Sequence, residues 1–181
     1  AACSGFIYAA ATAHGLLTTL GGQYALVIGC EALSRMMDPT DRTTCVLFGD
    51  GGGAAVFALR EDAPFAVTLG ARGGDAIRVG GAAARDAAPI TMDGRAVFRF
   101  AVEAMPRCLQ TVLASSGMTL EDLDWVVCHQ ANSRIIDHCI KHLHAEPSKF
   151  YKNMDRHGNT GAASIPIALH EMEENGLLQP G

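Results

Sequence analysis

Short apolar stretches alternate with helix-like stretches along the chain, and this alternation constrains the fold more than any other feature. The run "YALVIGC" (24–30) lies between glycines, as expected of a strand covered on both faces, and "DWVVCHQ" (124–130) is a second such strand. Four segments are typical of helices: 4–20, 94–116, 132–144 and 161–175, the last ending at Gly176. Strands that alternate with helices predict an α/β layered fold with a largely parallel sheet.

Two reactive side chains stand where the chain enters a helix. Cys3 precedes the segment 4–20, and His129 directly follows the apolar strand before the segment 132–144. In doubly wound α/β sheets, sites are built at such junctions, at the carboxyl ends of strands. Two similar units that each deliver one reactive side chain indicate an internally duplicated fold.

Composition excludes several classes of protein. Of the 181 residues, 49% are hydrophobic and only 18% charged, so the chain is globular rather than disordered. The net charge of −5 gives no basic footprint for nucleic acid, and no apolar run is long enough to span a membrane. No secretory signal is visible, and the six cysteines lie in apolar runs without compact spacing. Buried free thiols in a reducing compartment therefore fit better than disulfides, and we expect a cytoplasmic protein.

Cys3, in "AACSGF", is the first candidate for chemistry. A cysteine among small residues is by default a core residue. At a helix N-terminus, however, free backbone amides and the helix dipole favour the thiolate, which predicts a lowered pKa and a nucleophilic sulfur. The small neighbours leave room for a substrate.

His129 and Asn159 extend this candidate site. A single histidine is usually structural, and an Asn beside Gly, as in "RHGNTGAAS", is usually part of a turn or a helix cap. Taken together, Cys3, His129 and Asn159 form a Cys-His-Asn set in which each residue lies at the mouth of a helix.

These stretches resemble a known family. With "DPTDRTTCVLFGDGGGAAV", "TMDGRAVFRFAV", "DWVVCHQANSRII" and "DRHGNTGAASIPIAL", the chain is similar from end to end to β-ketoacyl-acyl-carrier-protein synthase III, the initiating condensing enzyme of type II fatty acid synthesis. Elongating synthases have a second histidine where Asn159 stands. The resemblance implies a thiolase-like, duplicated α-β-α layered fold, a homodimer, and no cofactor or metal.

The resemblance also implies roles for residues. Cys3 would take an acyl group from acyl-coenzyme A, and His129 and Asn159 would stabilise the enolate formed when malonyl-acyl carrier protein loses carbon dioxide. Further positions carry over: Arg42, Gly94, Phe98 and Asn132 in the channel for coenzyme A or pantetheine, Leu33, Phe48 and Ile90 in the acyl pocket, and Arg134 in contact with the carrier protein. Without the resemblance, Arg134 would be a solvated helix residue, and Leu33 and Phe48 core residues.

Parts of the sequence also match the patterns of other functions. "GDGGGA" (49–54) matches a dinucleotide-binding pattern but continues into "AVFAL", which is strand-like, so we reject that function. His138 and His142 share a helix face without further ligands, which favours a plain exposed face over a metal site. A chalcone synthase-like or polyketide-priming enzyme, or a related acyltransferase, stays open as an alternative. A Cys-His-Asn hydrolase of the papain type stays as a distant one, although the local signatures differ.

The length departs from the family. Family members begin well before the cysteine and continue past "LLQPG". We therefore expect a partial chain in which 1–70 is the end of the first thiolase-like half and 71–181 most of the second, without the N-terminal part and the last strands.

Overall fold

A computed structural model describes residues 1–80 and 88–179. Its helices are α1 (Gly5–Leu20), α2 (Gly94–Ser116), α3 (Ser133–Leu143), α4 (Met154–His157) and α5 (Ser164–Glu174), with short 3-10 turns η1 (Ala2–Ser4), η2 (Leu33–Met36), η3 (Pro147–Lys149) and η4 (Gly161–Ala163). The strands are β1 (Tyr24–Ala32), β2 (Asp50–Ala58), β3 (Ile77–Arg78) and β4 (Thr91–Met92). Within the described residues, no helix combines the length and apolar character needed to cross a bilayer.

The sequence explains where the main helices begin and end. The Asp93 carboxylate accepts the backbone N–H groups of Arg95 and Ala96 at the start of α2, and Asn132 caps α3 in the same way. α1 ends at Gly21, whose left-handed φ of 70° lets its N–H reach the carbonyl of Leu17. These three helices were predicted to within one or two residues.

The two long strands, β1 and β2, form an antiparallel ladder, which corrects the expected largely parallel sheet. They are joined by η2 and a series of turns over 37–49, without the crossover helix that a parallel connection requires, so the chain simply reverses direction. Parallel pairing occurs only as single bridges, Phe48 with Asn159 and Val126 with Phe150, in the described residues. The predicted strand at 124–130 is therefore one bridge followed by irregular backbone.

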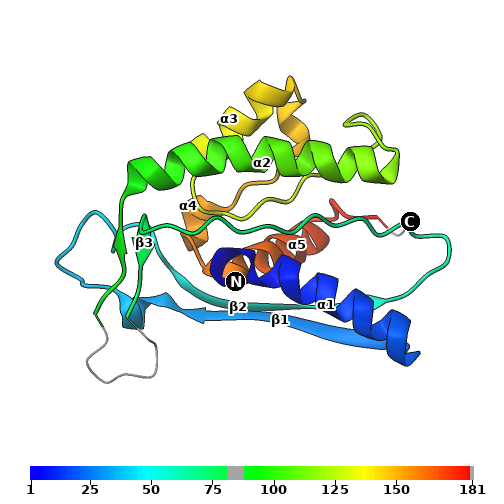
Figure 1. Ribbon diagram of the computed structural model, residues 1–181, viewed down its shortest axis with the longest axis horizontal. Helices are drawn as coiled ribbons and strands as arrows, with labels where there is room; N and C mark the ends of the chain where they lie inside the picture. Colours follow the sequence, from blue (N-terminus) through cyan, green and yellow to red (C-terminus); the bar gives the residue numbers. More distant parts are fainter. Residues whose placement is uncertain (81–87, 180–181) are drawn as a thin grey trace.

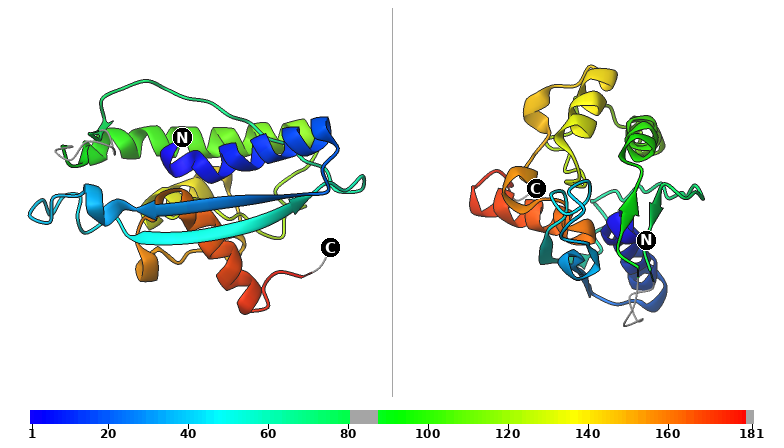
Figure 2. Two further views of the ribbon diagram at one scale, coloured as in Figure 1. Left: turned by 90° about the horizontal axis from the view of Figure 1, so that it is seen from below. Right: turned by 90° about the vertical axis from the view of Figure 1, so that its left-hand side faces the viewer.

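One face of this sheet is covered (Figures 1 and 2). α1 and α5 pack against it and enclose a core of Phe6, Ala13, Val27 and Ile165. Burial alternates along β1, so Tyr24, Leu26 and Ile28 are exposed on the other face. The strand was predicted to be covered on both faces, but within the described residues it is covered on one face only.

A second core lies between α2 and α3, at the top of Figure 1. Ile136, Cys139 and Ile140 of α3 share one helical face and pack with Cys128 and Phe150. Because Cys128 belongs to this core, the residue that follows it, His129, leaves the core towards α5.

Candidate active site

Cys3 lies in the 3-10 turn η1, immediately before α1. Its neighbour Ala2 has a left-handed φ of 45°, a conformation that costs a non-glycine residue roughly 1 kcal/mol and recurs at functional sites. Gly5 lets this turn approach η4, because an added Cβ would stand 3.1 Å from the Cβ of Ala162. The half-buried thiol therefore faces the stretch that carries Asn159.

The environment of Cys3 corrects the predicted low pKa. Burial raises the pKa of the thiol, and the negative charge of Glu31 raises it further. Hydrogen bonds from its own backbone amide and from the Asn159 side chain lower the pKa but do not outweigh burial. The resting nucleophile is the neutral thiol, because burial and the nearby Glu31 carboxylate both disfavour the thiolate.

Asn159 is buried, with its side-chain amide aimed at Cys3. Its backbone N–H donates to the carbonyl of Leu47 at 2.8 Å, and its carbonyl accepts from Gly49 at 2.9 Å. The side-chain Oδ1 accepts the Gly161 N–H at 3.0 Å, which leaves the amide N–H groups for the sulfur of Cys3. The Asn159 side chain is therefore anchored through Oδ1, and its amide serves as a hydrogen-bond donor on the side of Cys3.

Two glycines allow the turn around Asn159 to lie against the sheet. A Cβ on Gly49 would stand 2.1 Å from the carbonyl oxygen of His157, and one on Gly29 would stand 2.6 Å from that of Ala162. No side chain fits at either distance, so glycine is required at these two positions, where the 157–163 backbone comes close. The glycine-rich stretch 49–54, which matches a dinucleotide-binding pattern in sequence, leads into β2, and its Gly49 allows this packing.

His129 presents one free ring nitrogen. Its Nδ1 lies 2.7 Å from the Oγ of Ser164, whereas its Nε2 is buried and has no hydrogen-bond partner among the described residues. Burial lowers the pKa of His129 to about 4, although an interaction with the Gly161 backbone offsets this in part. The ring is therefore neutral near pH 7, and Nε2 remains available to a ligand.

Gln130 fixes the backbone beside His129. Its side-chain amide donates to the carbonyls of Cys128 and Tyr151 at 2.8 and 3.1 Å, and its Oε1 accepts the Asn153 N–H at 2.9 Å. Because Gln130 is almost fully buried, these bonds tie the segment that carries His129 to the one that leads towards Asn159.

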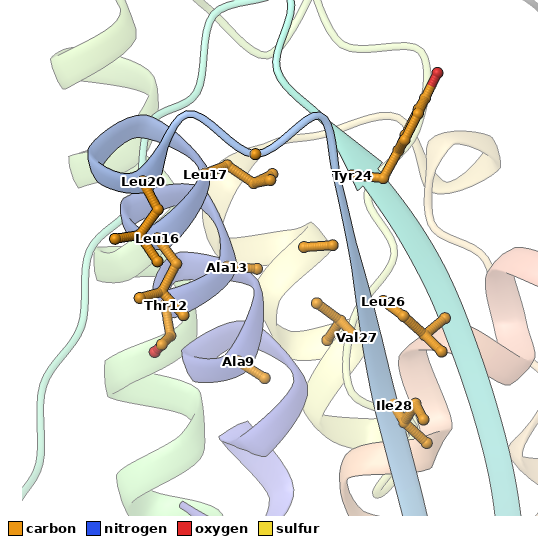
Figure 3. Close-up of a pocket in the computed structure, with 12 residues that line it drawn as sticks. Ala9, Thr12, Ala13, Leu16, Leu17, Leu20, Tyr24, Leu26, Val27 and Ile28 are labelled. Carbon is orange, nitrogen blue, oxygen red and sulfur yellow. The ribbon is translucent and has the colours of Figure 1, made fainter.

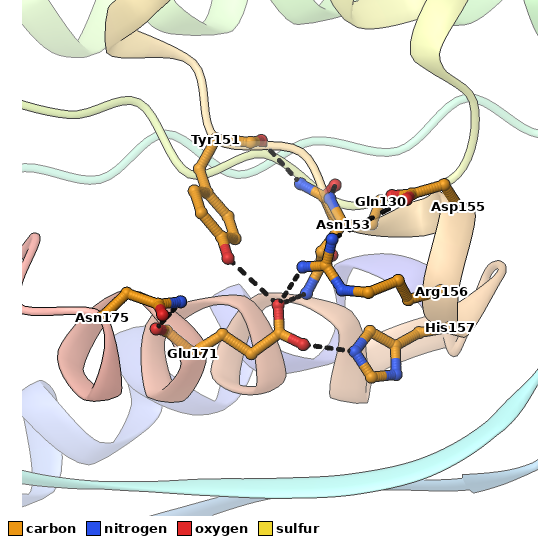
Figure 4. Close-up of polar contacts among 8 residues, drawn as sticks. All are labelled: Gln130, Tyr151, Asn153, Asp155, Arg156, His157, Glu171 and Asn175. Carbon is orange, nitrogen blue, oxygen red and sulfur yellow. Dashed lines mark hydrogen bonds and ion pairs between the residues drawn. The ribbon is translucent and has the colours of Figure 1, made fainter.

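A carboxylate on α5 holds that second segment (Figure 4). Glu171 accepts hydrogen bonds from Tyr151, Asn153, Arg156 and His157 at 2.5–3.1 Å. Four side chains on the turn before Asn159 thus converge on one group of the helix after it, which holds the turn in place.

The residues predicted for the channel lie on three elements. Phe98 of α2 makes an edge contact with the ring of His138 on α3, at a centroid distance of 6.5 Å. Asn132 caps α3, with its Oδ1 accepting from Arg134 at 2.9 Å. Gly94 is the first residue of α2, and Arg42 is exposed in the turns before β2, as is Arg134 on α3.

The residues predicted for the acyl pocket lie on the segments around β2. Phe48 pairs with Asn159 in the parallel bridge, so it is next to the site. Ile90 is buried, and its N–H donates at 2.7 Å to Met36, in the same turn as Leu33. Backbone pairing therefore joins Phe48 directly to Asn159, and it joins Ile90 to the turn that carries Leu33.

The hollow shown in Figure 3 is a different feature. It lies between the second half of α1 and the first half of β1, lined by Ala13, Leu17 and Val27 among others. None of the predicted catalytic residues lines it. Metal binding has no candidate either, since no three His, Cys, Asp or Glu side chains gather within the described residues.

Two residues of the site were missed by the sequence analysis. Ser164 contacts the site through its hydrogen bond with His129. Glu31 contacts it by accepting a hydrogen bond from the backbone N–H of Ala162 at 3.2 Å. Ser164 stands in the quoted motif "HGNTGAAS", and Glu31 directly follows the strand "YALVIGC", but no local pattern gives either one a role.

Comparison with known proteins decides the family. A family model described as 3-oxoacyl-[acyl-carrier-protein] synthase III matches residues 1–74, and the model of the C-terminal part of the same family matches residues 113–181. The chain belongs to the 3-oxoacyl-[acyl-carrier-protein] synthase III family.

Individual members agree with this assignment. The chain is 42% identical over 196 residues to the β-ketoacyl-[acyl-carrier-protein] synthase III of Clostridium beijerinckii, an alignment that covers 99% of this chain and 59% of the relative. The crystal structure of the Thermus thermophilus enzyme of that name superposes with a TM-score of 0.92 at 41% identity, covering 100% of this chain and 60% of that one. The priming β-ketosynthase of the R1128 polyketide pathway gives 0.87 at 31% identity, covering 100% and 57%.

These matches show the fold. The described residues form part of the thiolase-like fold of this family. The chain spans about three fifths of the length of the relatives that it matches.

Proposed function

We propose that this chain carries the catalytic residues of a condensing enzyme that joins an acyl group from acyl-coenzyme A to malonyl-acyl carrier protein, with loss of carbon dioxide, to give 3-oxoacyl-acyl carrier protein. The observation that carries the proposal is the Asn159 amide beside the Cys3 thiol, together with the Nε2 of His129, which has no hydrogen-bond partner in the part of the chain that the structure describes. A nucleophile with two neutral donors suits a reaction that develops an oxyanion.

The first half-reaction forms an acyl-enzyme. The sulfur of Cys3 attacks the thioester carbonyl of acyl-coenzyme A, the bond to the coenzyme A sulfur breaks, and the departing thiolate takes up the proton that Cys3 releases. Because the Cys3 thiol is neutral at rest, its proton must leave as the new carbon–sulfur bond forms. The small residues around Cys3 and the Asn159 amide support approach of the carbonyl.

The second half-reaction forms the carbon–carbon bond. The bond to the malonyl carboxylate breaks, carbon dioxide leaves, and the electron pair forms an enolate whose oxygen accepts hydrogen bonds from His129 and Asn159. The enolate carbon then attacks the acyl carbonyl on Cys3, and the sulfur departs and regains a proton. Neither donor changes charge, because His129 is neutral near pH 7 and an amide does not titrate.

Substrates and partners follow from the surrounding residues. Arg42 and Arg134, both exposed, would attract the phosphates of coenzyme A and the acidic carrier protein. Gly94, Phe98 and Asn132 would border the pantetheine channel, and Leu33, Phe48 and Ile90 the acyl pocket. The proposed steps use these residues without a cofactor.

The larger setting is part of the same proposal. Residues 1–70 would form the end of one half of a duplicated fold and residues 71–181 most of the other, in a cytoplasmic homodimer. The exposed apolar face of β1 supports a partner for that face, since three large side chains on it are open to solvent.

A polyketide-priming enzyme is the second candidate. Its support is the similarity to the R1128 priming β-ketosynthase, and the set Cys3, His129 and Asn159 would serve that reaction equally well. The two functions differ in the acyl group accepted and in the carrier protein served.

The test is to mix the full-length protein with a panel of acyl-coenzyme A thioesters and to measure its mass. We expect an adduct on Cys3 and, after malonyl-acyl carrier protein is added, a 3-oxoacyl product. An adduct that water releases as a free acid, without condensation, would contradict the proposal and favour a hydrolase.

A further inference from the structure

The Ser164 hydroxyl forms a hydrogen bond with Nδ1 of His129, the ring nitrogen other than the available Nε2. Ser164 is the first residue of α5, and only 3% of it is exposed. Its Oγ has two partners, the Nδ1 of His129 at 2.7 Å and the backbone N–H of Gln130 at 3.3 Å. A buried hydroxyl must satisfy its proton inside the protein, because water does not reach it.

The direction of these bonds follows from the number of protons. The Gln130 N–H is a donor, so Oγ accepts that bond. The single proton of Ser164 then needs an acceptor, and Nδ1 is the only candidate among its partners in the described chain. The hydroxyl therefore donates to Nδ1. The reverse arrangement would give Oγ two donors and leave its own proton buried without an acceptor.

We propose that Ser164 is a positioning residue that holds His129 as the tautomer protonated at Nε2. A neutral imidazole has one N–H, and a bond accepted at Nδ1 assigns the proton to the other nitrogen. This inference rests on the proposed function, since the Nε2–H is the donor that the enolate oxygen requires.

The same tautomer limits what His129 does for Cys3. A protonated Nε2 has no lone pair with which to take a proton from the thiol. His129 therefore acts in decarboxylation, and the proton of Cys3 leaves by another route. Ser164 should accordingly affect the second half-reaction and leave acyl transfer nearly unchanged.

The direct test is nitrogen-15 NMR of histidine-labelled full-length protein near pH 7, with the His129 signal assigned from a His129→Asn variant. We expect a protonated Nε2 and an unprotonated, hydrogen-bonded Nδ1. A proton on Nδ1, donated to Ser164 or to the Gly161 backbone, would overturn the proposal. This measurement needs neither activity nor a Ser164 variant, so it stands even if condensation is not observed.

A kinetic test separates positioning from folding. Ser164→Ala should slow decarboxylation of malonyl thioester roughly tenfold, as loss of one oriented hydrogen bond implies, and leave acylation of Cys3 within about twofold. Ser164→Thr, which keeps the hydroxyl, should recover most of the rate, and Ser115→Ala, at an exposed site on α2, should change neither half-reaction. Equal decarboxylation by Ser164→Ala and the unmodified enzyme would contradict the role of Ser164. Absence of condensation in the unmodified enzyme would count against the proposed function instead.

Discussion

Replacement of Glu171 by glutamine tests whether the turn before Asn159 is held by charge. The substitution keeps the shape of the side chain and removes the negative charge that Arg156 and His157 contact. Glu174→Gln is a matched control, because Glu174 lies on the same helix but is two-thirds exposed and pairs with the exposed His170 at 3.6 Å.

The magnitude follows from the pKa of Glu171. Burial by itself would raise the pKa, but hydrogen bonds from His157, Asn153, Arg156 and Tyr151 outweigh it and lower the pKa from 4.5 to about 2. A shift of that size corresponds to at most roughly 3 kcal/mol. Because the carboxylate is partly open to solvent, which screens the charges, we expect Glu171→Gln to cost about 1–2 kcal/mol of unfolding free energy at pH 7.

The dependence on pH has a definite sign. A carboxylate whose pKa is lowered by folding contributes stability above its unfolded pKa, and that contribution is lost as pH falls towards the folded pKa of about 2. The difference in unfolding free energy between Glu171→Gln and the unmodified full-length protein should therefore shrink as the pH falls from about 4.5 to about 2. Urea unfolding at pH 7 and at about pH 3 measures it. If Glu171→Gln is as stable as Glu174→Gln at pH 7, or if the difference grows as the solution is acidified, the carboxylate does not hold this turn.

Three further outcomes follow from the site and its surroundings. Glu31→Gln should speed alkylation of Cys3 by iodoacetamide at pH 7.5, followed by peptide mapping, because removal of that charge lowers the thiol pKa; an unchanged or slower rate would contradict the electrostatics. Gly29→Ala should lower the unfolding free energy measured in urea by about 1–3 kcal/mol, because the new Cβ overlaps the 157–163 backbone. Gly15→Ala on α1, where an added Cβ meets nothing within 4 Å, should not destabilise the protein, and equal stabilities of the two variants would refute the close approach. Arg134→Glu should raise the KM for malonyl-acyl carrier protein at low salt and spare acylation by acyl-coenzyme A, whereas an equal fall in both rates would assign Arg134 to the fold.

The sequence predicted the helices well because their signals are local. Capping residues, left-handed glycines and the spacing of buried side chains act within a few residues of α1, α2 and α3. Strand pairing depends on distant segments, and here prediction was poorer. The stretch "AVFAL" was correctly predicted to be strand-like, but its antiparallel pairing with β1 and the way the glycines of β2 admit α5 were not predicted.

Motifs predicted the members of the candidate site but not its electrostatics. The Asn159 side chain interacts with the Cys3 thiol, and the catalytic roles of Cys3, His129 and Asn159 stay a prediction. The raised pKa of Cys3 could not be foreseen, because it depends on burial and on Glu31, which comes close only through the packing of β1 against η4. Of the six predicted buried thiols, only Cys128 and Cys139 are fully buried, and burial raises their pKa values to about 12 and about 11.

The central claim is that Cys3 serves as nucleophile while His129 and Asn159 act after acylation. The most direct measurement is carbon dioxide release from malonyl-acyl carrier protein by acylated Asn159→Ala in the full-length protein, with the acyl group on Cys3 counted by mass spectrometry in the same sample. Asn175→Ala, exposed at the end of α5, is the control. We expect Asn159→Ala to acylate normally and to release carbon dioxide roughly 10²–10³ times more slowly than the control. Release at the control rate, or a loss of acylation as large as the loss of release, would contradict the division of roles.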